Sequence, residues 1–186
     1  MVRRTRTQKI LRFLRNTVLV LFALLLVGAV VFVIEVRIPD PLDKGEQAIV
    51  PKRRMDAEGR WRVGNDWLGR DSLGLYETYI EGGDLERGLA YGSLARELIE
   101  KQERIFTDRI QALVPGKRKL EVLKYFVAWF DRNLPAYVPR EYQREIFGVS
   151  RSFSDRYDFI GPKFHRALNY HAAHDIGHAL QDLALV

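Results

Sequence analysis

The chain has 186 residues, 30 of them lysine or arginine and 24 aspartate or glutamate, and it contains no cysteine. Without cysteine the fold cannot be supported by disulfides, so a hydrophobic core must suffice, and a chain of this length can build one. The basic excess lies at the N-terminus, where six basic residues precede the first acidic one, Glu35. Beyond them 24 basic residues stand against 24 acidic ones, so we expect no nucleic acid as a partner.

A run of seventeen apolar residues, Val18 to Ile34, follows a basic tail over residues 1–16. Seventeen helical residues are about the minimum that crosses the ~30 Å hydrocarbon core of a bilayer. The run predicts a transmembrane signal-anchor over residues 17–36, with the lipid bilayer as its partner. Because basic residues stay in the cytoplasm, we expect the tail there and the rest outside, on the periplasmic side in a bacterium.

A cleaved signal peptide is the competing interpretation of the same segment. Its apolar region is usually ~7–15 residues long and ends in a small-residue cleavage site. Here Glu35 and Val36 follow the run, which favours an uncleaved anchor.

After the anchor, composition and period predict a mainly α fold with one or two short strands. Residues 37–60 are rich in proline, glycine and charge, which is typical of a linker that packs little. Aromatic and apolar residues between Trp61 and Ile80 predict the strands, with turns at 64–66 and 82–83. Residues 61–186 are then expected to form one largely helical region.

The helical period predicts four helices in this region. One long amphipathic helix runs from Asp84 to the stop at Pro115 and Gly116. A second has a single apolar stripe over residues 120–134 and stops before Pro135. Two more open at Pro139 and Pro162.

Histidines gather on the last predicted helix. At 3.6 residues per turn, His171, His174 and His178 fall in one narrow sector. His174 and His178 have a metalloprotease-like spacing, but Asp175 stands where such a site needs glutamate, and His165 is the one histidine left for a third ligand.

We therefore predict no bound metal and no other cofactor, and we interpret Asn169, His171, His174, Asp175 and His178 as candidate pocket-wall residues. A partly solvated polar helix face is an equally good interpretation. A metal-dependent membrane hydrolase that uses His171, His174, His178 and Asp175 stays an alternative, and it predicts a stoichiometric transition metal.

A glycine pattern opens the first predicted helix, where Gly82, Glu86, Gly88 and Gly92 stand in the order Gly-x-x-x-Glu-x-Gly-x-x-x-Gly. Gly82 permits the turn from strand to helix, and Gly88 and Gly92 give a small face that can lie close against a sheet. The pattern resembles the acyl-coenzyme A:6-aminopenicillanic acid acyltransferase family of autoproteolytic N-terminal-nucleophile hydrolases. Residues 141–150 and 167–170 resemble later segments of that family, and residues 152–186 resemble its membrane-anchored bacterial members.

This resemblance implies that residues 61–186 are the N-terminal helical portion of an αββα sandwich, completed by a β-rich C-terminal chain. It places Val186 at, or one residue before, an autoproteolytic junction. The cysteine that follows becomes the nucleophile, with its own α-amino group as base. The expected substrates are small molecules with an amide or thioester acyl group, which passes to water or to an amine.

On this interpretation the present chain carries no catalytic residue of its own and is inactive alone. It tethers the enzyme and shapes one wall of the acyl pocket, whether as a processed subunit or as a truncated fragment. A non-catalytic, membrane-tethered helical interaction domain is the remaining alternative.

Overall fold

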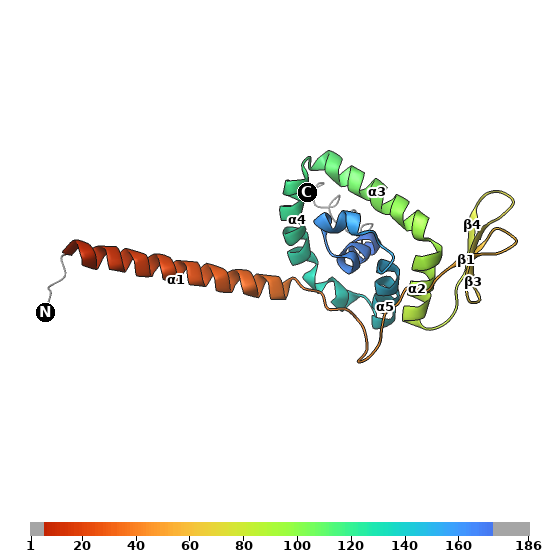
Figure 1. The fold of residues 1–186 in the computed structure, drawn as a ribbon, viewed down its shortest axis with the longest axis horizontal. Coiled ribbons are helices and arrows are strands. Elements are labelled where there is room, and N and C mark those ends of the chain that lie inside the picture. The colour runs from red at the N-terminus through yellow and green to blue at the C-terminus, as the bar shows by residue number, and fades with distance from the viewer. Residues whose placement is uncertain (1–5, 173–186) are drawn as a thin grey trace, which may run out of the picture. The chain divides into compact units, whose positions relative to one another are not determined.

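The computed structural model describes residues 6–172, which divide into two compact units between Arg37 and Ile38 (Figure 1). The first unit is helix α1 (Arg6–Glu35). Its segment Ile10–Glu35 has 26 residues with a mean hydropathy of 3.2 in its most apolar window, none of which the protein buries. At 1.5 Å per residue it is about 39 Å long, enough to cross a bilayer. A membrane anchor and a signal sequence both meet this description.

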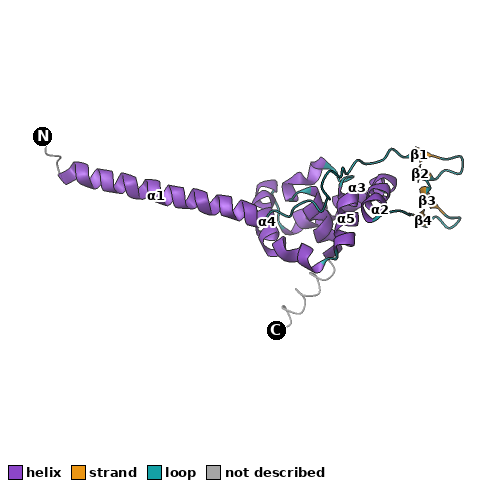
Figure 2. Cartoon of the chain, turned by 90° about the horizontal axis from the view of Figure 1, so that it is seen from below, coloured by secondary structure: helices purple, strands orange, loops and turns teal. Residues whose placement is uncertain are grey.

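The second unit contains a small antiparallel sheet in the order β1 (Arg54–Met55), β2 (Trp61–Val63), β3 (Asp66–Arg70) and β4 (Tyr76–Tyr79). Val63 pairs with Asp66, so residues 64 and 65 form a two-residue hairpin loop in which Gly64 has φ +58°. The sheet lies beside α2 (Figure 2). Its residue Leu68 packs on Leu94 and Ala95 and so joins the sheet to the helices.

Helices make up most of the second unit: α2 (Asp84–Leu94), α3 (Arg96–Leu113), α4 (Lys117–Phe130), the 3-10 helix η1 (Asp131–Tyr137), α5 (Arg140–Ser150), the 3-10 helix η2 (Asp155–Ile160) and a last helix described over residues 163–172. Helices α2 to α5 surround the last helix (Figure 1). Phe164, Ala167 and Leu168 of that helix are buried, and Phe164 meets Phe147 edge to face at 5.3 Å. The prediction of a mainly α fold with a few short strands is confirmed, although the sheet has four strands rather than one or two.

The predicted long helix from Asp84 to Leu113 is two helices, which break at Ala95. Arg53 donates a hydrogen bond from Nη1 to the carbonyl oxygen of Leu94 at 3.1 Å, which gives this oxygen a partner from outside the helix. Ala95, which is fully buried, closes α2 by donating from its N–H to Tyr91 O at 2.8 Å. The partner of the Leu94 carbonyl oxygen is about forty positions away, a contact that the helical period alone could not reveal.

The predicted second helix also ends early. Helix α4 stops at Phe130 and the chain continues as the 3-10 helix η1, which contains Pro135. Of the predicted stripe Leu120 is buried, whereas Phe126 and Phe130 are exposed.

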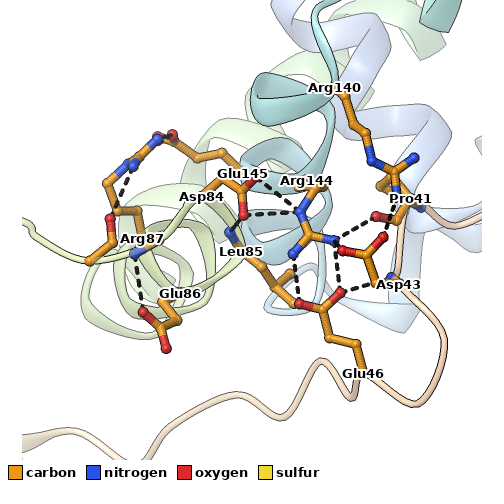
Figure 3. A network of polar contacts seen from close by, with 12 residues as sticks. Pro41, Asp43, Glu46, Asp84, Leu85, Glu86, Arg87, Arg140, Arg144 and Glu145 are labelled. Carbon is orange, nitrogen blue, oxygen red and sulfur yellow. Dashed lines mark hydrogen bonds and ion pairs between the residues drawn. The ribbon is translucent and has the colours of Figure 1, made fainter.

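The expectation that residues 37–60 pack little is wrong in part, because most of the segment is exposed but several of its residues contact the helices. Ile38 is buried in the main core, and Ser93 donates its hydroxyl hydrogen to Pro51 O at 2.7 Å. Arg144 of α5 links the same segment to α2, because its guanidinium binds Glu46 of the segment at 2.6 Å and Asp84 of α2 at 2.9 Å (Figure 3). The hydrogen bond from Arg144 lowers the pKa of Glu46 to about 2, so the pair is charged at neutral pH.

Candidate functional site

Gly88 and Gly92 of the sequence pattern lie where α2 crosses α5. A Cβ atom added at Gly88 would lie 2.0 Å from Glu145 O, and one added at Gly148 would lie 2.7 Å from Leu89 N. At Gly92 the corresponding distance to Val149 O is 3.0 Å. The two backbones are therefore in direct contact, and no other residue type fits at the closest points.

The small face of α2 was expected to lie against a sheet, and within the described residues it lies against a helix instead. Gly82 and Glu86 serve the start of α2. Gly82 has φ +100°, and Glu86 accepts a hydrogen bond from Gly83 N–H at 3.0 Å, which is the half of a capping box that a glycine at the N-cap allows.

A buried ion pair fixes the last helix to its surroundings. Arg166 Nε lies 3.1 Å from Glu103 Oε1 of α3, with side-chain exposures of 2% and 1%. The same guanidinium donates to Gly161 O and Ser154 O, both at 2.8 Å, and Glu103 accepts from Ser154 N–H at 2.9 Å. One charged pair thereby holds α3, the η2 segment and the last helix in place.

Two cavities lie on either side of the last helix. The first, which we call the α4 cavity, has a volume of about 520 Å³ and is mostly apolar. Its apolar wall comes from α3, α4 and η2: Phe106, Ile110, Leu120, Leu123, Phe126, Val127, Phe130 and Ile160. Asn169 and Tyr170 supply polar groups from the last helix.

The second cavity, which we call the α5 cavity, has about 510 Å³ and lies among α2, α3, α5 and the last helix. Tyr170 borders both cavities, and the centroid of its ring lies 4.7 Å from that of Phe106 and 5.9 Å from that of Phe153. Burial raises the pKa of Tyr170 to about 12, so at neutral pH its hydroxyl is a hydrogen-bond donor.

The structure separates the predicted pocket-wall residues that it describes. Asn169 borders the α4 cavity and His171 the α5 cavity. His171 Nδ1 lies 2.8 Å from Ala167 O, and because a carbonyl only accepts, this nitrogen carries a hydrogen and leaves Nε2 as the group available to a ligand. His174, Asp175 and His178 lie outside the described residues, so their predicted role stays a prediction.

Among residues 6–172 no three histidine or carboxylate side chains are placed to share a metal ion. His165 is engaged elsewhere, because its Nε2 accepts a hydrogen bond from Ile38 N–H at 3.3 Å. An accepting ring nitrogen is unprotonated, so this contact needs neutral histidine.

This contact predicts a pH dependence of stability. Burial lowers the pKa of His165, against the opposing effect of Asp40, so the folded-state pKa is below the unfolded value of 6.5. The stability contributed by neutral His165 is complete above the unfolded pKa. It is lost as the pH falls from there through the folded-state pKa. We expect the melting temperature to fall between about pH 7.5 and about pH 5.

His165→Gln is the matched variant, since its amide oxygen can accept the same hydrogen bond but does not titrate. Its melting temperature should vary less over this pH range than that of the unchanged protein. Equal slopes in the two proteins would rule out His165 as the titrating group.

Sequence reasoning did not identify the ion pair or the role of Tyr170. A usable signal was present in α3, where Glu103 and Thr107 follow Ile99 at helical spacing on the inward face. A carboxylate in such a stripe indicates a buried partner cation, because an isolated buried charge is very costly.

Comparison with known proteins finds no matching family model, no matching curated protein and no matching solved structure.

Proposed function

We propose that this chain is the N-terminal portion of a membrane-anchored, autoproteolytic cysteine acyltransferase or amidohydrolase. The observation that supports this most is the crossing of α2 and α5. Two separate segments resemble the acyltransferase family, one around Gly88 and one around Gly148, and their glycines fit against each other's backbone. A shared packing requirement explains why both patterns occur in one chain.

The cavities fit the proposed substrate class of acyl amides and acyl thioesters. Small-molecule sites are concave and mostly apolar, with a few polar groups that fix orientation. The α4 cavity has this character, with the Asn169 and Tyr170 side chains at its border. By the resemblance, the chain after Tyr170 leads to the nucleophile, so we assign the acyl-binding wall to the residues around the last helix.

In the proposed reaction the cysteine at the start of the second polypeptide attacks the acyl carbonyl carbon, and its α-amino group takes the thiol proton. The amine or thiol leaving group departs with a proton, and a thioester to the enzyme remains. Water or an amine then attacks this thioester and restores the thiol. The present chain positions the acyl group and binds the second polypeptide.

The same proposal gives the membrane topology. Helix α1 is retained as an anchor, and the arginine-rich tail stays in the cytoplasm. The second unit is outside the cytoplasm, on the periplasmic side in a bacterium. The asymmetry of basic residues around the apolar segment supports this orientation.

Mass spectrometry of the native protein, purified from its membrane in mild detergent, tests the proposal. We expect this chain together with a second, non-covalently retained polypeptide whose first residue is cysteine. A reagent specific for N-terminal cysteine, such as a cyanobenzothiazole, should label the second polypeptide alone, because the present chain has no cysteine and is an internal control.

Recovery of this chain alone, folded and unlabelled, would overturn the proposal. In that case a stoichiometric metal in the purified protein would support the metal-dependent hydrolase, and its absence would leave the tethered interaction domain.

A further inference from the structure

Helix α4 exposes a large apolar face. Val122 is 59% exposed, Phe126 60% and Phe130 77%, and Tyr125 and Trp129 of the same helix are also exposed. We call these five residues the α4 outer face. So large a cluster of exposed apolar side chains indicates a surface that meets another apolar phase.

The geometry of α4 separates this face from the one that packs on the domain. At 100° per residue, Leu120 and Val127 point to one side, and Leu120 is 2% exposed. Val122, Tyr125 and Trp129 lie on the opposite side, and Phe126 and Phe130 lie between the two sides, where they are exposed and also border the α4 cavity. Helix α4 therefore has apolar residues around more than half of its circumference. Packing within the domain does not use the side that carries Val122, Tyr125 and Trp129, so the apolar residues there indicate another role.

Basic residues accompany the outer face. Lys117, Arg118 and Lys119 form the exposed first turn of α4, which has no acidic residue. Cations at a helix N-terminus are unfavourable because the helix dipole is positive there. They therefore weaken the isolated helix, and a partner with negative charge explains them better than helix stability does.

The position of α1 in the chain indicates the identity of this negatively charged and apolar partner. Two residues separate α1, which can cross a bilayer, from Ile38 at the start of the second unit. A domain on so short a connection stays close to the lipid surface. Tryptophan, tyrosine and phenylalanine beside lysine and arginine are the side chains of helices that lie in the interface of an anionic bilayer.

We propose that the α4 outer face docks on the surface of an anionic phospholipid bilayer, with α4 lying along the interface. This inference depends on α1 being held in the membrane and on nothing in the proposed enzymatic reaction. Docking would limit the orientations of the domain relative to the bilayer, and the outer wall of the α4 cavity would then face lipid.

Nitroxide labelling of the full-length chain tests this proposal, and its lack of cysteine allows single labels without background. The chain with Phe130→Cys is labelled and reconstituted in bilayers containing anionic phospholipid. Collisions with oxygen, which partitions into lipid, are compared with collisions with a water-soluble nickel chelate. We expect the Phe130 label to favour oxygen.

Two further single-cysteine variants calibrate the result. Leu73→Cys replaces a residue that is 82% exposed in the β3–β4 turn, and its label should favour the nickel chelate. Phe22→Cys places the label in α1 and should report deep burial in lipid, which checks the anchor separately from α4.

The second measurement is the effect of basic residues on the fraction of docked domain. Removing Arg118 and Lys119 as Arg118→Gln and Lys119→Gln should lower the ratio of docked to undocked domain by about fivefold for each charge. The matched control replaces Lys44 and Lys52, two exposed lysines of the segment before β1, and should leave the ratio unchanged.

Two outcomes would overturn the proposal, provided that the Phe22 label is deep in lipid. In the first, the Phe130 label behaves like the Leu73 label and meets the nickel chelate freely. In the second, neither oxygen nor nickel reaches it, which means that protein covers the α4 outer face.

Discussion

Gly88→Ala is expected to lower the free energy of unfolding of the second unit by about 3 kcal/mol. The new Cβ would lie 2.0 Å from Glu145 O, so α2 and α5 would have to move apart. Neither backbone can yield locally, because Leu89 on one helix and Phe147 on the other are buried in the main core. Chemical denaturation of the full chain in detergent, followed by tryptophan fluorescence, measures the change.

Three other glycines provide a graded control. Gly148→Ala should destabilise comparably, since its Cβ would lie 2.7 Å from Leu89 N. Gly92→Ala should cost less, because the nearest atom, 2.8 Å away, is the side-chain oxygen of Ser152. Gly28→Ala in α1 has no atom within 4 Å and should be neutral. Equal effects at Gly88 and Gly28 would contradict the close helix contact.

Features encoded by local pattern could be predicted from the sequence. The apolar run Val18 to Ile34 predicted α1, the prolines at 139 and 162 predicted two helix starts, and Gly64 predicted a hairpin turn. Each depends on residues within a few positions of one another, such as proline's fixed φ or glycine's access to positive φ.

Features that depend on distant residues were missed. The break at Ala95 involves Arg53, and the packing of the segment before β1 involves Arg144, and neither pairing has a local signature. The prediction for α4 failed in part for a related reason. An apolar stripe shows which side chains avoid water, but it does not distinguish the core of the domain from an external partner.

The candidate site could be predicted only as a region. Asn169 and His171 each border a cavity, as residues on a pocket wall must, but they lie on different sides of the last helix. The walls opposite them come from α3, α4 and α5, so the shape of the cavities depends on how these helices pack. That packing depends in turn on Arg166 and Glu103, whose pairing across 63 positions no motif shows.

Arg166→Met is the second substitution with a large expected effect. It removes the guanidinium that holds Glu103, Asp158 and two carbonyl groups, and it leaves the Glu103 carboxylate buried without its cation. Breaking a buried ion pair in this way costs about 3–5 kcal/mol. The α4 cavity should be affected as well, since Arg166 lies in its wall and holds the helix that carries Asn169.

The double variant Arg166→Met with Glu103→Met distinguishes lost charge pairing from lost packing. If the unpaired carboxylate is the main cost, the double variant should be more stable than Arg166→Met alone, since it leaves no buried charge. Arg140→Gln is the control, because its ion pair with Asp43 is 62% and 68% exposed and should contribute little. A double variant less stable than Arg166→Met would contradict this, because it would show that the hydrogen bond that Glu103 accepts from Ser154 N–H contributes more than the unpaired carboxylate costs.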